Sequence, residues 1–126
     1  MNIHNIHEMY DYHTSLIMKL VLNENSCCVD VGAHMGSILN EMIGTSPLGH
    51  HFAFEPIPYL FEKLRADFSS EKVTILDCAL SDQDGRDEFF LFKNEPGYSG
   101  LKQRKFGEEA AYLIEKIEVQ KKSLMK

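Results

Sequence analysis

Two glycines and a carboxylate stand close together early in the chain, in the stretch Val29-Asp30-Val31-Gly32-Ala33-His34-Met35-Gly36. An apolar run from Cys27 to Val31 comes first, and a helical pattern begins directly after Gly36, which predicts a short buried strand that turns sharply into a helix. Such a turn directs backbone N–H groups at one place, and glycines there let a ligand approach the backbone closely. We expect Asp30 at the strand end, where its carboxylate can accept hydrogen bonds from an ammonium or amide group.

Three carboxylates, Asp30, Glu55 and Asp77, each lie at the end of a predicted strand. Ligands of open parallel sheets bind at the carboxyl ends of the strands. Glu55 follows Gly36 by 19 residues, close to the spacing of about 20 at which an acidic residue reaches a ribose diol. A carboxylate suits a diol because it accepts two hydrogen bonds at once. The pattern therefore predicts a ligand that contains adenosine.

The glycine pattern differs from the dinucleotide fingerprint G-x-G-x-x-G, because His34 and Ser37 occupy its second and third glycine positions. A pyrophosphate would also avoid Asp30, whereas a ligand with an ammonium group, such as S-adenosylmethionine, would suit it. Plainer interpretations stay open: the two glycines as a tight turn only, Glu55 as an exposed strand end, Asp77 as a loop cap and Cys78 as a small buried side chain. Tyr98 and Ser99 could border a substrate or form only a turn, and no side chain is identified as a catalytic base.

Strands and helices alternate through the first 80 residues, which predicts a parallel β-α-β-α-β core of the α/β class. An N-terminal helix over about 6–22 carries an apolar stripe, and a short helix after Gly36 is expected to end at Gly44. A second strand ends at Glu55, a helix begins with Pro58 in its first turn, and a third strand covers 72–77. Two further strands, about 87–92 and 115–120, are expected to add to the sheet as an antiparallel pair.

Composition narrows the possible functions. The chain has 126 residues, 44% of them hydrophobic, and a net charge of −6, which argues against nucleic acid or an anionic membrane as partner. No apolar run is long enough to span a membrane and no secretion signal stands at the start, so we expect a cytoplasmic protein. Three cysteines make no disulfide framework. His4 and His7 lack further ligands for a metal, and His50 and His51 are interpreted as solvated loop residues.

The stretches VDVGAHMG, FAFEPIP and ILDCALSDQDG, in this order and spacing, resemble the FkbM-type family of S-adenosylmethionine-dependent methyltransferases. The resemblance covers about residues 27–120, including the later GYSGL and IEKIEV. It implies a Rossmann-like class I methyltransferase fold and O-methylation of a hydroxyl on a sugar or natural-product scaffold, so that the acceptor is a small molecule or a glycan.

The same resemblance implies roles for seven residues and places an eighth, His34, in the cofactor-binding loop. Asp30, Gly32, Ala33 and Gly36 would line the methionine part of S-adenosylmethionine, Glu55 would hold the ribose hydroxyls, and Asp77 and Cys78 would flank the adenine. His34 stands at a position in this loop where the family usually has Asn.

The resemblance also implies a longer domain, in which the strand at 27–31 is central and has a later parallel strand beside it. We therefore expect residues 1–126 to be the front part of one truncated methyltransferase domain. The open edge of strand 27–31 is then expected to recruit another chain, as in a homo-oligomer. Two other functions remain: a non-catalytic nucleotide- or cofactor-binding domain, and an NAD-dependent oxidoreductase, which the glycine pattern disfavours.

Overall fold

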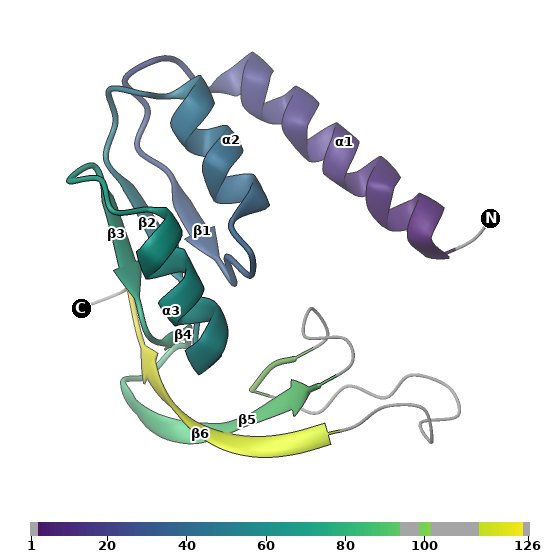
Figure 1. Ribbon diagram of the computed structural model, residues 1–126, viewed down its shortest axis with the longest axis vertical. Coiled ribbons are helices and arrows are strands. Elements are labelled where there is room, and N and C mark those ends of the chain that lie inside the picture. Colours follow the sequence, from purple (N-terminus) through teal and green to yellow (C-terminus); the bar gives the residue numbers. More distant parts are fainter. Residues whose placement is uncertain (1–2, 94–98, 102–113, 125–126) are drawn as a thin grey trace.

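Three short parallel strands form the sheet that positions the glycine loop. The computed structural model describes residues 3–93, 99–101 and 114–124 (Figure 1). Strands β1 (Val29–Val31), β2 (His51–Phe54) and β3 (Val73–Leu76) pair in the order β1-β2-β3. The intervening helices α2 (Ser37–Thr45) and α3 (Pro58–Asp67) return the chain for each parallel pairing. The predicted α/β class and parallel β-α-β-α-β core are confirmed.

Helices α2 and α3 cover one face of this sheet (Figure 1). A cluster of four buried residues lies between the helices and the strands: Ala33, Leu39, Ala53 and Leu64. Because successive side chains of a strand point to opposite faces, Val29 and Val31 point away from Asp30; they are 47% and 58% exposed. Phe52 is paired with Val29 in the register and is also exposed. The face opposite α2 and α3 is therefore apolar and partly uncovered.

The outer edge of β1 is unpaired within the described ranges, where β1 has β2 as its one neighbour. The expectation that β1 pairs with the strand preceding Glu55 is confirmed. Neither of the strands predicted at about 87–92 and 115–120 pairs with the outer edge of β1.

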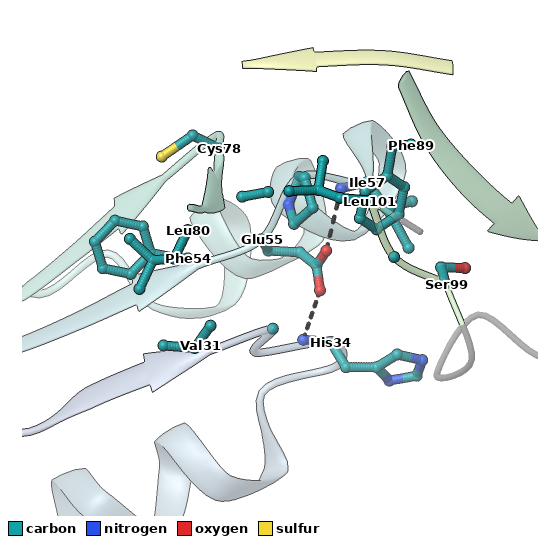
Figure 2. Close-up of a pocket in the computed structure, with 14 residues that line it drawn as sticks. Val31, His34, Phe54, Glu55, Ile57, Cys78, Leu80, Phe89, Ser99 and Leu101 are labelled. Atoms are coloured by element: carbon teal, nitrogen blue, oxygen red, sulfur yellow. Dashed lines mark hydrogen bonds between the residues drawn. The ribbon is translucent and has the colours of Figure 1, made fainter. Parts of the chain in front are cut away.

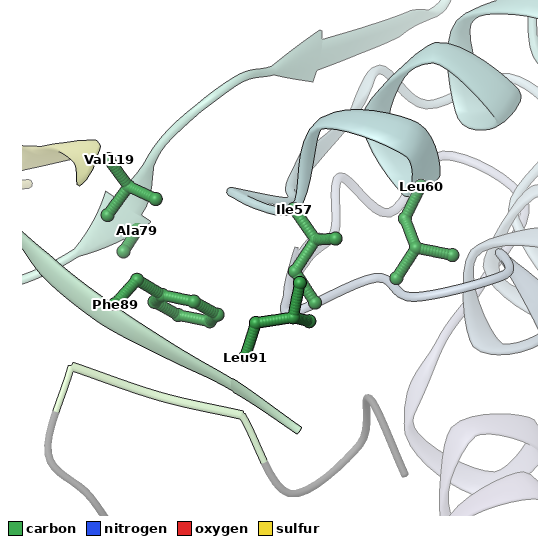
Figure 3. Packing of buried hydrophobic residues seen from close by; sticks show 6 residues of the cluster. All are labelled: Ile57, Leu60, Ala79, Phe89, Leu91 and Val119. Atoms are coloured by element: carbon green, nitrogen blue, oxygen red, sulfur yellow. The ribbon is translucent and has the colours of Figure 1, made fainter. Parts of the chain in front are cut away.

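The later strands build a second sheet, in the order β4-β6-β5. Strand β5 (Gly85–Phe92) pairs antiparallel with β6 (Ile114–Lys122), as predicted, and the two-residue strand β4 (Ala79–Leu80) pairs parallel with β6. The prediction that this pair adds to the first sheet is wrong, because β4 takes the edge of β6 that such an addition would need. The second sheet packs instead against the start of α3, through a buried cluster: Ile57, Leu60, Ala79, Phe89, Leu91 and Val119 (Figure 3).

Helix α1 (Ile3–Val21) lies beside α2 on the outside of the molecule (Figure 1). Its predicted span of 6–22 is confirmed, with an earlier start. The Ser15 hydroxyl donates to the Glu41 carboxylate of α2 at 2.7 and 2.8 Å, and Met18 is buried. The apolar stripe lies on the side of α1 that faces solvent, since Ile17 is 58% and Leu20 84% exposed. None of the described helices is long and apolar enough to cross a membrane.

Two local predictions are wrong. His51 is buried within β2, where its Nδ1 accepts from the N–H of Cys28 at 3.3 Å and its Nε2 lies 2.8 Å from the Ser46 carbonyl oxygen. These bonds tie the start of β1 to the end of α2, so His51 is a structural residue. Gly44 lies inside α2, which continues to Thr45 and is capped at Ser46.

Candidate functional site

A cavity of about 550 Å³ opens at the carboxyl ends of β1 and β2 (Figure 2). Its volume lies within the range of about 300–1,000 Å³ that is common for small-molecule sites. The other side is closed by β4, β5 and residues 99–101. The lining consists of Val31, Gly32, His34, Phe54, Glu55, Pro56, Ile57, Cys78, Ala79, Leu80, Phe89, Ser99, Gly100 and Leu101. The position is the one where parallel α/β sheets bind ligands.

The loop after β1 has three left-handed residues in five positions. Gly32, His34 and Gly36 have φ angles of 73°, 54° and 90°. The N–H groups of Gly32 and Ala33 both donate to the Phe54 carbonyl oxygen, at 2.8 and 3.1 Å, so the loop is held against the end of β2. The predicted sharp strand-to-helix turn is confirmed.

The two glycines of this loop serve different purposes. A Cβ on Gly36 would lie 2.5 Å from Cε2 of Phe68, so this glycine allows α3 to pack closely against the loop. A Cβ on Gly32 would meet nothing within 4 Å. Gly32 therefore leaves backbone exposed at the cavity wall, where a ligand can approach it.

Glu55 holds two parts of the cavity wall together. Its Oε1 accepts from the N–H of His34 at 2.8 Å, and its Oε2 accepts from the N–H of Ile57 at 3.1 Å (Figure 2). The side chain is 3% exposed. Burial raises the pKa of this carboxyl, while the two backbone hydrogen bonds and the charge of His34 lower it and the charge of Asp30 raises it further. Glu55 is thus a buried acid that fixes the glycine loop to the start of α3.

Asp30 lies inside β1, as its middle residue, and not at the strand end. The side chain is 9% exposed, and its Oδ2 has no hydrogen-bond partner among the described residues. Burial raises the pKa of this carboxyl. An acceptor that is buried without a donor is costly to a folded chain, so its presence beside Glu55 is unusual for a purely structural residue.

The predicted site residues divide into three groups. Gly32, His34, Glu55 and Cys78 line the cavity. Three others, Asp30, Ala33 and Gly36, are buried and are not part of the cavity lining. Asp77 follows β3 as an exposed residue outside the cavity lining.

Comparison with solved structures finds several matches, and three of them are methyltransferases of limited similarity. An FkbM methyltransferase from Methylobacillus flagellatus is 20% identical with a TM-score of 0.45, and the match covers 52% of this chain and 20% of that protein. A proposed rRNA methylase from Clostridium thermocellum is 14% identical with a TM-score of 0.49, over 53% of this chain and 39% of that protein. A precorrin-6y C5,15-methyltransferase from Geobacter metallireducens is 28% identical with a TM-score of 0.45, over 52% of this chain and 36% of that protein.

The chain thus spans well under half the length of each of these proteins. No protein-family model matches the sequence, and no curated protein is similar to it.

Part of the lining was missed by the sequence interpretation. Leu80 and Phe89 come from β4 and β5, and Leu101 from the short segment after Ser99. Ser99 was considered as a substrate neighbour and does line the cavity, whereas Tyr98 lies outside the described residues. In the sequence, these apolar residues look like ordinary core positions, because only the docking of the second sheet shows which of them face a cavity. Among the described residues, no three His, Cys, Asp or Glu side chains are grouped as a metal site.

Proposed function

We propose that the cavity binds S-adenosylmethionine and that the chain is the cofactor-binding part of a methyltransferase that acts on a hydroxyl group. The observation that carries the proposal is the pairing of Gly32 and Glu55 at one cavity wall: backbone open to a ligand lies next to a buried acid, at the carboxyl ends of parallel strands. The resemblance to the FkbM-type family supports the same assignment from the sequence.

Each part of the ligand has a candidate partner. The ribose hydroxyls would donate to Glu55, whose two oxygens each keep a lone pair after accepting one backbone N–H. The ammonium group would lie toward Asp30, whose unpaired Oδ2 is an acceptor for it. The adenine would pack against apolar lining near Cys78 and Leu80. The exposed position of Asp77 gives it at most an indirect part in this arrangement.

The cofactor supplies an electrophilic methyl group on a sulfonium sulfur. The chain's own contribution is to bind and orient that group and to exclude water from it. The apolar lining that includes Phe54, Ile57 and Phe89 serves the second purpose. The acceptor proposed here is a hydroxyl of a sugar or natural-product scaffold, in a small molecule or a glycan.

Thermal unfolding with S-adenosylhomocysteine, NAD and ATP tests this proposal. We expect S-adenosylhomocysteine to raise the melting temperature, since a ligand at a hundred times its Kd adds about 2.7 kcal/mol to the free energy of unfolding. Stabilisation by NAD alone would favour the oxidoreductase interpretation. If none of the three ligands shifts the transition and calorimetry detects no heat of binding, the proposal is wrong.

Two variants locate the ligand. Gly32→Asn suits a left-handed residue and meets no protein atom at its Cβ, yet it fills the open cavity wall. Because Asn tolerates the left-handed region, the variant should lower the melting temperature of the free protein only slightly, and it should lose most of the ligand shift. Where the variant keeps its melting temperature, Glu55→Ala should weaken S-adenosylhomocysteine binding by about 1–3 kcal/mol, the scale of charge-assisted hydrogen bonds. Unchanged affinity in both variants would place the ligand elsewhere.

A further inference from the structure

Helix α1 presents its apolar side to solvent. Exposed large apolar residues recur along it at helical spacing: Met9, Tyr10, Leu16, Ile17, Leu20 and Val21. The opposite side contacts α2 through the hydrogen bonds of Ser15 to Glu41, and Met18 is buried. An amphipathic helix of a globular protein normally buries its apolar stripe, whereas none of the described residues covers this one, and an uncovered stripe of this kind indicates a contact surface.

The charges of α1 are kept away from the stripe. Glu8, Asp11 and Lys19 lie seven or four residues from Ser15 and therefore share its side of the helix. A partner of the stripe consequently meets neutral surface along the whole helix. Lys19 is the one Lys or Arg of α1, whereas helices that lie on anionic membranes are rich in Lys and Arg. This charge distribution favours a protein surface as partner.

The order of residues in the stripe is symmetric about its centre. Counting from His13, stripe residues lie three positions away (Tyr10 and Leu16), four positions away (Met9 and Ile17) and seven positions away (Ile6 and Leu20). An antiparallel partner with the same sequence would therefore place large apolar residues opposite one another at these three pairs of positions, while Val21 would lie opposite Asn5. This is the self-complementarity that a two-fold interface requires.

We propose that α1 is a dimerisation helix, which pairs antiparallel with α1 of a second copy across a two-fold axis at His13. Tyr10 then lies near Leu16 of the second copy, Met9 near its Ile17, and Ile6 near its Leu20. The 19 residues of α1 give a contact about 28 Å long. This interface is separate from the open edge of β1 and from the cavity.

Sedimentation velocity on the full chain tests the surface. We expect a concentration-dependent dimer, which Leu16→Asp and Ile17→Asp shift to monomer by placing an unpaired charge in the contact. Asn40→Asp is the matched control, because it adds the same charge at an exposed position of α2 and should leave the dimer intact. A monomer at all concentrations overturns the proposal, as does a dimer that both α1 variants leave unchanged. Flotation with anionic vesicles in place of dimerisation would assign the helix to a membrane.

A crosslink tests the position of the axis. Helices packed 8–10 Å apart, with Cα atoms about 2.3 Å from each axis, bring facing Cα atoms to about 3.4–5.4 Å, which overlaps the range of disulfides. In a Cys27→Ser background, which removes the exposed native thiol, His13→Cys should form a disulfide-linked dimer on mild oxidation. Thr14→Cys, one residue away and off the stripe, should form far less. Equal crosslinking of the two variants would overturn the two-fold axis at His13.

Discussion

Glu55 in the cavity lining and Asp30 outside it are both buried carboxylates, and they differ in what surrounds them. Glu55 has a backbone N–H on each oxygen, whereas Oδ2 of Asp30 has no donor among the described residues. The first stabilises the loop, and the second costs stability in the free protein. Residues of this second kind are common at binding sites, where the ligand supplies the missing partner.

Asp30→Asn should raise the stability of the free protein, and should do so most at neutral pH. Burial raises the pKa of Asp30 above its ordinary value of 3.8, so at pH values between the unfolded and the folded pKa the folded chain holds a proton that the unfolded chain has lost. Stability from this group is complete below the ordinary value and is lost as the pH rises through the folded pKa. Asp30→Asn cannot ionise at this position, so the variant does not lose this stability as the pH rises.

Denaturant unfolding from acidic to neutral pH measures the effect, as a difference in slope between wild type and variant. Asp87 provides the control, because its pKa is lowered, first by the N–H of Glu88 and then by Lys121; Asp87→Asn should lose stability toward neutral pH. A slope that Asp30→Asn leaves unaltered would mean that Asp30 is already neutral or already paired. The same variant should weaken S-adenosylhomocysteine binding if Asp30 receives the ammonium group.

At the scale of elements, helix α2 shows why two glycines in one segment are not equivalent. Gly36, the residue before the helix, combines a φ of 90° with contact to Phe68. Gly44 lies in the last turn with nothing within 4 Å of a Cβ. The first glycine is required by backbone conformation and packing, and the second is not.

Gly36→Ala should therefore lower the free energy of unfolding by about 1–3 kcal/mol, from left-handed strain and overpacking against Phe68. Gly44→Ala should raise it by about 0.5–1 kcal/mol, because alanine loses less backbone entropy within a helix. Urea unfolding of the two variants measures both signs. Similar effects of the two substitutions would contradict the assignment of Gly36 as the required glycine.

Most elements of the first sheet could be predicted because each has a local signal. Val73 and Ile75 are β-branched and mark β3, and Pro58 marks the first turn of α3. The second sheet was only partly predictable, since β4 has two residues and no periodicity can be seen in so short a segment. The orientation of α1 could not be predicted either, because a helical period defines a stripe but not the surface that covers it.

The candidate site was predictable to a similar degree. Spacing identified Gly32 and Glu55, and the family resemblance added His34; the structure places all three in the cavity lining. It could not show that Glu55 bonds two backbone N–H groups, since this depends on how α3 approaches the loop. Asp77 shared the strand-end pattern, yet the chain bends after Leu76 toward the second sheet and leaves it exposed.

At the scale of the whole molecule, the cavity exists because two sheets meet. Leu91 and Val119 of the second sheet pack with Ile57 and Leu60 from the start of α3 (Figure 3). The same arrangement brings Phe89 and Leu80 to the cavity. Packing between the sheets and the shape of the site are therefore linked.

Leu91→Ala should lower the free energy of unfolding by about 2–5 kcal/mol, the usual cost of a buried leucine. Leu91 is buried in the shared cluster but does not line the cavity, so loss of S-adenosylhomocysteine binding in a still-folded variant would report a displaced second sheet. Leu48→Ala is the control, since Leu48 is 57% exposed and should change stability by less than about 0.5 kcal/mol. Equal effects of the two substitutions would mean that the sheets are not held together by this cluster.

The positive φ of His34 limits which residue types can replace it at the cavity wall. Asn, Asp and His tolerate this region of backbone space, glycine enters it freely, and β-branched residues are nearly excluded. The N–H that Glu55 holds is backbone and survives any exchange among them. Position 34 therefore accepts four kinds of residue, which carry an imidazole, an amide, a carboxylate or no side chain at all. Exchanging one for another alters the chemistry that a ligand meets while the loop keeps its shape, so new specificities can arise here by single substitutions without refolding the site.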